Sequence, residues 1–277
     1  MRGFGSDDLP KPMVPLGGRP ILWHLMKYYA HFGHRDFIIC LGHKAQAIKQ
    51  FFVNYQEWVS NDFVLSDGGR RIELLARDIE DWRITLVDTG ITATIGERLL
   101  AVRPFLRGEE MFMANYADGL TDCPLPAIVD QLERTGAVGV CMVVRPNISI
   151  HTVRYTAKGV VTDILDSEHA GSWTNAGFFA FRQEIFDYMR PGEELVGQAF
   201  QRLIADGRLA ALPYPGFWRC CDTFKDLQIL EQLLAGDRPP WQLWRRAPQP
   251  IESPSEAPAA LEAEQDWAEV PDAVCAA

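Results

Sequence analysis

The sequence predicts an α/β fold built on a mostly parallel, mixed sheet with helices on both faces. Short runs of four to eight apolar and β-branched residues alternate with amphipathic, helix-like segments along most of the chain. The chain has 277 residues, of which 47% are apolar and 23% charged, so it is long enough to bury a full core. The chain shows no internal repeat.

The first part of the chain alternates helix and strand patterns. Amphipathic segments predict helices over residues 21–32, 45–54 and 95–102. Between them, the runs 36–41 and 83–87 are short, apolar and β-branched, as is typical of buried strands. Gly42 ends the first of these runs.

The second part repeats this alternation with one antiparallel insertion. Residues 151–155 and 159–164 flank the turn 156–158 and predict a hairpin. The same patterns predict two further strands, 111–115 and 138–144, with a helix between them, 125–135. Three more helices are predicted after the hairpin: 183–189, 197–206 and 224–235.

Beyond Trp244 the composition changes. Residues 245–277 are rich in Pro, Ala and Glu without periodicity, which predicts a disordered acidic tail after one domain, 1–244. From 247 onward there are seven acids and no Lys or Arg, so the rest of the chain carries only about −3 of the net charge of −10. A general nucleic-acid surface, which needs clustered positive charge, is therefore not expected.

The sequence also bounds the compartment. No apolar run has membrane-spanning length and no signal-peptide pattern opens the chain, so we expect neither a membrane partner nor secretion. The six cysteines include no C-x-x-C spacing, and Cys40 and Cys141 lie inside apolar strands. A reducing cytoplasm is the expected location.

Lys11 lies between Pro10 and Pro12. Because each proline fixes its own φ and favours extended geometry in the preceding residue, we expect Lys11 on a stiff, non-helical loop with its ammonium group free to bind a phosphate. The simpler alternative is a surface lysine in a rigid loop.

Two aspartates follow or precede predicted elements at positions that suit a ligand site. Asp118 lies just past strand 111–115, and Asp222 lies directly before helix 224–235. Ligands of open α/β sheets gather at the carboxyl ends of strands, and Mg²⁺ is commonly bound by one or two carboxylates plus substrate phosphates. The alternative is structural, with Asp118 in a turn and Asp222 or Thr223 as a helix N-cap.

Taken together, several stretches resemble the sugar-nucleotide pyrophosphorylases, and most closely the glucose-1-phosphate cytidylyltransferases. The likeness runs in order from about Asp8 to Trp244. The matching stretches are Pro10-Lys11-Pro12-Met13, Gly17-Gly18-Arg19-Pro20, Asp36-Phe37-Ile38-Ile39-Cys40, Val87-Asp88-Thr89-Gly90, Gly96-Glu97-Arg98-Leu99, Asn115-Tyr116-Ala117-Asp118-Gly119, Asn175-Ala176-Gly177-Phe178-Phe179, and Pro215-Gly216-Phe217-Trp218 with Asp222-Thr223.

The resemblance implies a Rossmann-like nucleotidyltransferase fold and a reaction in which a sugar 1-phosphate attacks a nucleoside triphosphate and pyrophosphate is released. It implies CTP and glucose 1-phosphate as first substrates, in nucleotide-sugar and polysaccharide biosynthesis, with Mg²⁺ as cofactor. Lys11 then neutralises phosphate charge, and Asp118 and Asp222 hold the metal. It also implies substrate-binding residues: Thr89, Gly90, Gly96 and Arg98 near the nucleotide, and Asp166, Asn175 and Gly177 near the sugar.

This sequence departs from the family pattern at its beginning. The family opens with a buried apolar strand and a glycine-rich phosphate loop, and Met1-Arg2 aligns near the end of that loop. We therefore expect a sheet whose first central strand is missing. We also expect translation to start roughly 15–25 residues upstream, the usual span of a strand plus a loop.

A second departure concerns the sugar phosphate. Where the family has Glu-Lys-Pro, this chain has Asp166-Ser167-Glu168, so the lysine that holds the sugar phosphate is absent. Loss of a charge-assisted contact costs roughly 1.5–3 kcal/mol. Either another cation, Arg145 or Arg154, replaces it, or the substrate differs.

Three functions remain open at this level. The first is a sugar-1-phosphate nucleotidyltransferase, and the second is a catalytically impaired homologue that binds a nucleotide or sugar phosphate. The third is a metal-dependent glycosyltransferase, which shares the nucleotide-binding topology. Assembly of several copies of the chain is also left open.

Overall fold

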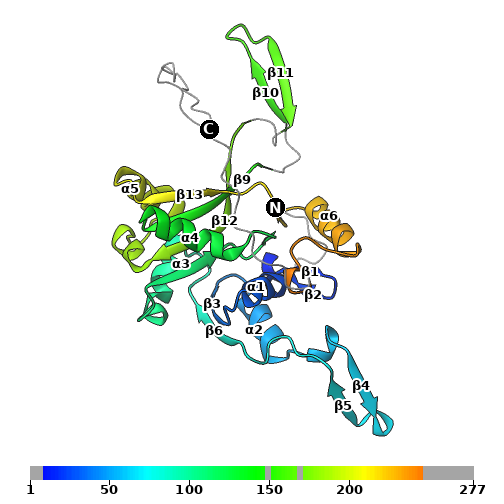
Figure 1. Cartoon of the computed structure of the whole chain (residues 1–277). Helices are drawn as coiled ribbons and strands as arrows, with labels where there is room; N and C mark the ends of the chain where they lie inside the picture. Colours follow the sequence, from blue (N-terminus) through cyan, green and yellow to red (C-terminus); the bar gives the residue numbers. More distant parts are fainter. Residues whose placement is uncertain (1–8, 147–150, 167–170, 246–277) are drawn as a thin grey trace. The chain divides into compact units, whose positions relative to one another are not determined.

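The computed structural model describes residues 9–146, 151–166 and 171–245. The chain divides into one unit, Met1–Arg245, and a second unit, Arg246–Ala277, which makes up almost all of the predicted tail. The second unit lies outside the described residues. The α-helices are α1 (Ile21–His31), α2 (Ala45–Val53), α3 (Ile95–Val102), α4 (Leu125–Thr135), α5 (Phe200–Ala205) and α6 (Phe224–Leu234) (Figure 1).

The strands are short and form several sheets. In chain order they are β1 (Pro15–Leu16), β2 (Arg19–Pro20), β3 (Asp36–Leu41), β4 (Phe63–Ser66), β5 (Arg71–Leu74), β6 (Arg83–Asp88), β7 (Met111–Asn115), β8 (Gly119–Thr121), β9 (Gly139–Val144), β10 (His151–Tyr155), β11 (Val161–Asp166), β12 (Thr174–Arg182), β13 (Leu209–Pro213) and β14 (Trp218–Cys220).

The largest sheet has four strands in the order β13-β9-β12-β7. Strand β13 pairs in parallel with β9, whereas β12 is antiparallel to both β9 and β7. Strands β7, β9 and β13 therefore run the same way and β12 opposes them. A second sheet consists of the parallel pair β3–β6. The predicted mixed α/β architecture is confirmed.

Helices cover both faces of the four-stranded sheet. The side chains of β12, which point alternately to the two faces, pack against different helices on each face. Phe178 and Ala180 belong to one hydrophobic cluster, which includes buried residues of α1, α4 and α6. Phe179 and Phe181 point to the other face, into a cluster with residues of α3 and α5. Because successive side chains of a strand point to opposite faces, a strand buried on both faces must be apolar throughout.

Strands β3 and β7 are each half-buried and lie at an edge of their own sheet. Both nevertheless contact the same hydrophobic cluster, through Ile38 and Cys40 of β3 and Phe112 and Ala114 of β7. The two sheets therefore share one hydrophobic layer, but among the described strands neither β3 nor β7 has a partner on its outer edge. A sheet without its first central strand is what the resemblance predicts.

Several segments differ from the sequence prediction, and strands β1, β2, β8, β13 and β14 were not predicted. Residues 183–189 form a 3₁₀ helix, Gln183–Tyr188, and the helix expected over 197–206 begins with a π turn, Leu195–Ala199, before α5. Strand β12 was not predicted, because an apolar run buried on both faces has no period-2 signal. The hairpin β4–β5 was not predicted either.

Within the described ranges, none of the helices combines the length and the apolar character that crossing a bilayer requires.

Candidate functional site

Lys11 lies in a single 3₁₀ turn, Lys11–Met13, rather than in the extended loop that the sequence predicts. The N–H of Met13 donates to Pro10 O (2.8 Å) and that of Val14 to Lys11 O (3.1 Å), which closes the turn. Pro12 suits this position because its fixed φ is compatible with a helical turn and its missing N–H is not needed there. Met13 is buried, so the turn is anchored while Lys11 remains partly exposed.

The antiparallel ribbon β8–β14 brings the two aspartates together. Gly119, the first residue of β8, pairs with Cys220, the last residue of β14. Asp118 directly precedes Gly119, and Asp222 comes two residues after Cys220, so both aspartates lie at the same end of the ribbon. A backbone hydrogen bond from Cys221 N to Asp118 O (2.9 Å) joins the two loops.

The Lys11 ammonium group contacts both carboxylates. Its Nζ lies 2.5 Å from Asp222 Oδ1 and 4.0 Å from Asp118 Oδ2. The hydrogen bond to Asp222 raises the pKa of Lys11 and lowers the pKa of Asp222. Burial, followed by the negative charge of Asp222, raises the pKa of Asp118. The cluster thus holds two carboxylates and one cation, a net negative charge that a further cation can balance.

The start of α6 shows whether Asp222 or Thr223 is the helix N-cap. Thr223 is the N-cap: its hydroxyl accepts from Asp226 N, and the Asp226 carboxylate accepts in return from Thr223 N. Asp222 is therefore not used as a cap and is free to contact Lys11. The Cys220 thiol donates to Asp222, and burial raises the pKa of Cys220 to about 12, so it stays protonated.

Asn175 and Gly177 lie against the loop that bears Asp118. Asn175 Oδ1 accepts from Gly177 N (2.9 Å), and Gly177 O accepts from Tyr116 N (2.8 Å). Gly177 has a φ of +75°, and a Cβ added there would lie 2.5 Å from Tyr116 Cδ2. Only glycine fits this close approach at this φ, which explains the residue type. The register of β12 against β9 shifts at this point.

Thr89 and Arg98 form a second group, at the carboxyl end of β3. Arg98 Nη1 donates to Thr89 Oγ1 (2.7 Å) and Leu41 O (3.2 Å), so the guanidinium is fixed by neutral partners. Gly90, beside Thr89, is exposed with a φ of +96°. Gly96 is buried in α3, and a Cβ there would meet Glu193 O at 2.5 Å, which gives it a packing role.

Asp166, which the resemblance predicts near the sugar, lies at the end of β11 in the hairpin β10–β11. It is exposed and lies 3.1 Å from His151 Nε2. No contact of Asp166 joins it to Lys11, Asp118 or Asp222 within the part of the chain that the structure describes. Ser167, the residue in place of the family lysine, lies outside the described residues.

Two residues outside the predicted site set, Asp122 and Trp218, hold the loops of the site. Asp122 Oδ1 accepts from Tyr214 Oη (2.6 Å) and from Phe217 N (2.8 Å), which ties the segment before β14 to the end of β8. Trp218 Nε1 donates to Ala176 O (2.9 Å) and links β14 to the Asn175–Gly177 segment. Asp122 follows β8, which has only 3 residues and therefore gives no strand pattern that could have identified this acid.

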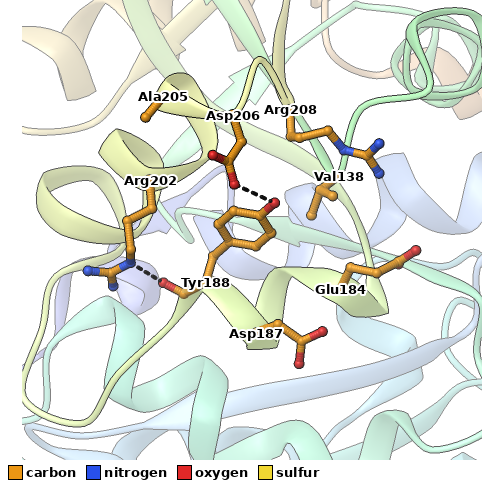
Figure 2. A pocket seen from close by; sticks show the side chains of 8 residues that line it. All are labelled: Val138, Glu184, Asp187, Tyr188, Arg202, Ala205, Asp206 and Arg208. Atoms are coloured by element: carbon orange, nitrogen blue, oxygen red, sulfur yellow. Dashed lines mark hydrogen bonds between the residues drawn. The ribbon is translucent and has the colours of Figure 1, made fainter.

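A separate hollow of about 580 Å³ contains none of the predicted site residues. In it the Tyr188 hydroxyl donates to Asp206 Oδ2 (3.1 Å) and Arg202 Nε donates to Tyr188 O (2.8 Å), as Figure 2 shows. One of its lining residues, Val138, directly precedes the amino end of β9. Asn175, by contrast, pairs with Val143, near the carboxyl end of that strand. It is therefore a different place from the Lys11 cluster.

Comparison with known proteins agrees with the fold. No family model matches the chain. The glucose-1-phosphate cytidylyltransferases of Salmonella typhimurium and Salmonella typhi are each 34% identical over 236 residues, which cover 85% of this chain and 91% of each relative. The solved structure of an apo UDP-glucose pyrophosphorylase superposes with a TM-score of 0.58 at 15% identity, covering 82% of this chain and 90% of that one.

The structural likeness shows the fold, a Rossmann-like α/β fold that this chain shares with the superposed structure. In this chain two aspartates and a lysine gather at one end of a ribbon. The sequence likeness is more specific. At 34% identity over most of both chains, this protein belongs to the glucose-1-phosphate cytidylyltransferase family. The predicted resemblance is confirmed.

Proposed function

We propose that this protein joins a nucleoside triphosphate, with CTP the first candidate, to a hexose 1-phosphate, with glucose 1-phosphate the first candidate, and releases pyrophosphate. Membership of the family supports the reaction class. The observation on which the proposal mainly rests is that Lys11, Asp118 and Asp222, far apart in sequence, share one cluster. The free thiols of the described cysteines fit a reducing cytoplasm, and a nucleotide sugar made there can supply polysaccharide synthesis.

In this reaction an oxygen of the sugar phosphate forms a bond to the α-phosphorus. The bond from that phosphorus to the bridging oxygen breaks, and pyrophosphate leaves with the electron pair. Such a transfer needs alignment and charge neutralisation more than covalent help from the protein. Lys11 is the cation in the cluster, and substrate phosphates can draw it away from Asp222, since both are partly exposed.

The donor set of the cluster fits Mg²⁺. Asp118 and Asp222 supply carboxylate oxygens within reach of one ammonium group, and no group of three or more metal-ligating side chains occurs among the described residues. Mg²⁺ is usually bound by one or two carboxylates, with water and substrate phosphates completing its shell. When bound, the ion would neutralise developing charge on the phosphate oxygens.

The test is pyrophosphate release from the purified full chain. We expect release only when CTP, glucose 1-phosphate and Mg²⁺ are all present, and its loss when EDTA removes the metal. Isothermal titration with each substrate serves as the control for binding. Binding without pyrophosphate release would favour the impaired homologue, and hydrolysis of a finished nucleotide sugar would point to a glycosyltransferase.

We also propose Arg145, rather than Arg154, as the cation for the sugar phosphate. Arg145 stacks on Trp173, with its guanidinium carbon 4.2 Å from the ring centroid, and its Nη1 donates to Ser172 O (3.3 Å). It directly follows β9, whose last residue, Val144, pairs with Thr174, next to Asn175. Arg154 instead faces Asp163 across the hairpin β10–β11.

We therefore expect Arg145→Ala to raise the KM for glucose 1-phosphate about 10- to 100-fold, the equivalent of one charge-assisted contact, with little change in the KM for CTP. Steady-state kinetics with each substrate varied in turn would measure this. Arg154→Ala is the matched control and should leave both KM values within about twofold. Equal effects of the two variants would contradict the assignment.

A further inference from the structure

The ammonium group of Lys11 contacts both carboxylates that the proposed function assigns to the metal. Its Nζ lies 2.5 Å from Asp222 Oδ1 and 4.0 Å from Asp118 Oδ2. Mg²⁺ binds its oxygen ligands at about 2.0–2.1 Å, so an ion held by the same oxygen of Asp222 would come close to the ammonium group. Two cations at such a distance repel each other strongly. Lys11 and a metal ion therefore compete for the same carboxylates.

The backbone that bears the two carboxylates is fixed. The ribbon β8–β14 joins the two loops, and Cys221 N donates to Asp118 O (2.9 Å). On the other side of Asp222, Thr223 belongs to the capping box of α6. The loops of Asp118 and Asp222 are thus held together and cannot separate to accept two cations side by side.

The side chain of Lys11, by contrast, can leave the cluster without a change in the backbone. The side chain is 41% exposed, and that of Asp222 is 45% exposed. The turn that bears Lys11 is closed by hydrogen bonds and anchored by the buried Met13, so its Cα keeps its place. The ammonium group lies at the end of a flexible four-carbon stem. Rotation about the bonds of this stem is enough to take the charge away from Asp222.

Lys11 is the cation with which Asp118 and Asp222 form ion pairs in the part of the chain that the structure describes. Arg219, three residues before Asp222, is paired with Asp226 instead (3.1 Å), and both of these side chains are largely buried. Removal of the Lys11 charge would therefore leave two neighbouring carboxylates without their cation. Such a pair attracts a divalent cation more strongly than a cluster that already holds a positive charge.

We propose that Lys11 acts as a gate on the metal site, which excludes free divalent cations until a triphosphate draws the ammonium group away from Asp222. This inference rests on the metal role that the proposed function gives to Asp118 and Asp222. A triphosphate carries several negative charges, and its oxygens are strong hydrogen-bond partners for an ammonium group. When it binds, Lys11 turns to the phosphates and both carboxylates become available. The nucleotide and the metal ion are therefore bound together, and the ion alone is kept out.

The test is the affinity of the purified full chain for Mn²⁺ without any substrate, measured from the electron paramagnetic resonance signal of the free ion. Mn²⁺ is the probe because it takes the same oxygen ligands as Mg²⁺. We expect Lys11→Met, which removes the charge and keeps an apolar stem, to bind Mn²⁺ at least about 10-fold more tightly than the unchanged protein. Lys11→Ala should act in the same way. Both variants should lose pyrophosphate release, so they gain the metal and lose the reaction.

Three further variants serve as controls. Lys11→Arg keeps a cation at the gate and should bind Mn²⁺ as weakly as the unchanged protein. Lys49→Met removes a lysine charge outside the cluster, at an exposed position of α2, and should change the affinity less than about twofold. Asp118→Asn combined with Lys11→Met should abolish the gain, because one of the two carboxylates is then lost. Circular dichroism shows whether each variant is folded.

Equal affinities of Lys11→Met, Lys11→Ala and the unchanged protein for Mn²⁺ would overturn the gate. So would tight binding by Lys11→Arg, an equal gain in Lys49→Met, or a gain that persists with Asp118→Asn.

The binding measurement includes no nucleotide and no turnover, so its outcome is separate from that of the proposed reaction. A gain of Mn²⁺ binding in Lys11→Met, with no pyrophosphate release by the unchanged protein, would reject the reaction and support the gate. Pyrophosphate release by the unchanged protein, with no such gain, would support the reaction and reject the gate.

Discussion

Replacing Asp118 by asparagine is expected to lower the turnover number of pyrophosphate release about 100- to 1,000-fold, the usual cost of removing one preorganised electrostatic partner from a reacting group. The amide keeps the shape of the side chain but removes the charge that, in our proposal, helps to hold Mg²⁺ against the phosphates. Turnover at saturating substrate and Mg²⁺ is the measurement. A rate within about threefold of normal would discard the metal role of Asp118.

The stability of the same variant separates loss of chemistry from loss of fold. Burial and the charge of Asp222 raise the pKa of Asp118, which means that its ionised form is unfavourable in the folded state. Asp118→Asn should therefore be at least as resistant to denaturant as the unchanged protein. Asp130→Asn, on the exposed side of α4, makes the same chemical change away from the cluster and should leave turnover unaffected.

The second large effect that we expect is a loss of folded-state stability in acid, caused by His24. This side chain is buried on α1, with Nε2 2.9 Å from Leu16 O and Nδ1 3.3 Å from Trp241 Nε1. An indole N–H can only donate, so Nδ1 accepts and Nε2 carries the proton that Leu16 O receives. A second proton would break the bond to Trp241. Burial accordingly lowers the pKa of His24 to about 4.

A lowered pKa means that the unfolded chain binds this proton more readily than the folded protein does. The contribution of His24 to stability is therefore complete above about pH 6.5 and is lost as the pH falls toward 4. This difference between the pKa values of His24 in the unfolded and folded states corresponds to about 3 kcal/mol in the free energy of unfolding. Urea unfolding at a series of pH values, compared with His24→Gln, measures it. The variant should lose less stability than the unchanged protein between pH 7 and 4, and equal losses would contradict the assignment.

Most helices and several strands could be predicted from the sequence because their signals are local. The bounds of α3, α4, β3 and β7 match the predicted ranges, since each helix has one clear periodicity and each strand is one short, mostly apolar run. Strand β12 could not be predicted in this way. Its residues are apolar on both faces, and Gly177, whose φ is positive, interrupts the run.

The site was predictable only in its residue types. Chain order and the family resemblance identified Lys11, Asp118 and Asp222 as candidates, and the acids qualified because they lie beside predicted element ends. The local conformation of Lys11 was predicted wrongly, since two prolines are compatible with a 3₁₀ turn as well as with an extended loop. Asp122 was overlooked because β8 is too short to give a periodic signal.

The sequence by itself determined the α/β class, the family, and which carboxylates and which cation were available, because these depend on residue identity and local periodicity. Only the tertiary structure decided that Thr223 is the N-cap of α6, so that Asp222 can contact Lys11. It also decided that Asp166 lies in the hairpin β10–β11, where it contacts His151. The physical reason is that these contacts join residues up to 211 positions apart. The register of β8 against β14 sets the contact between the site loops, and no local pattern encodes that register.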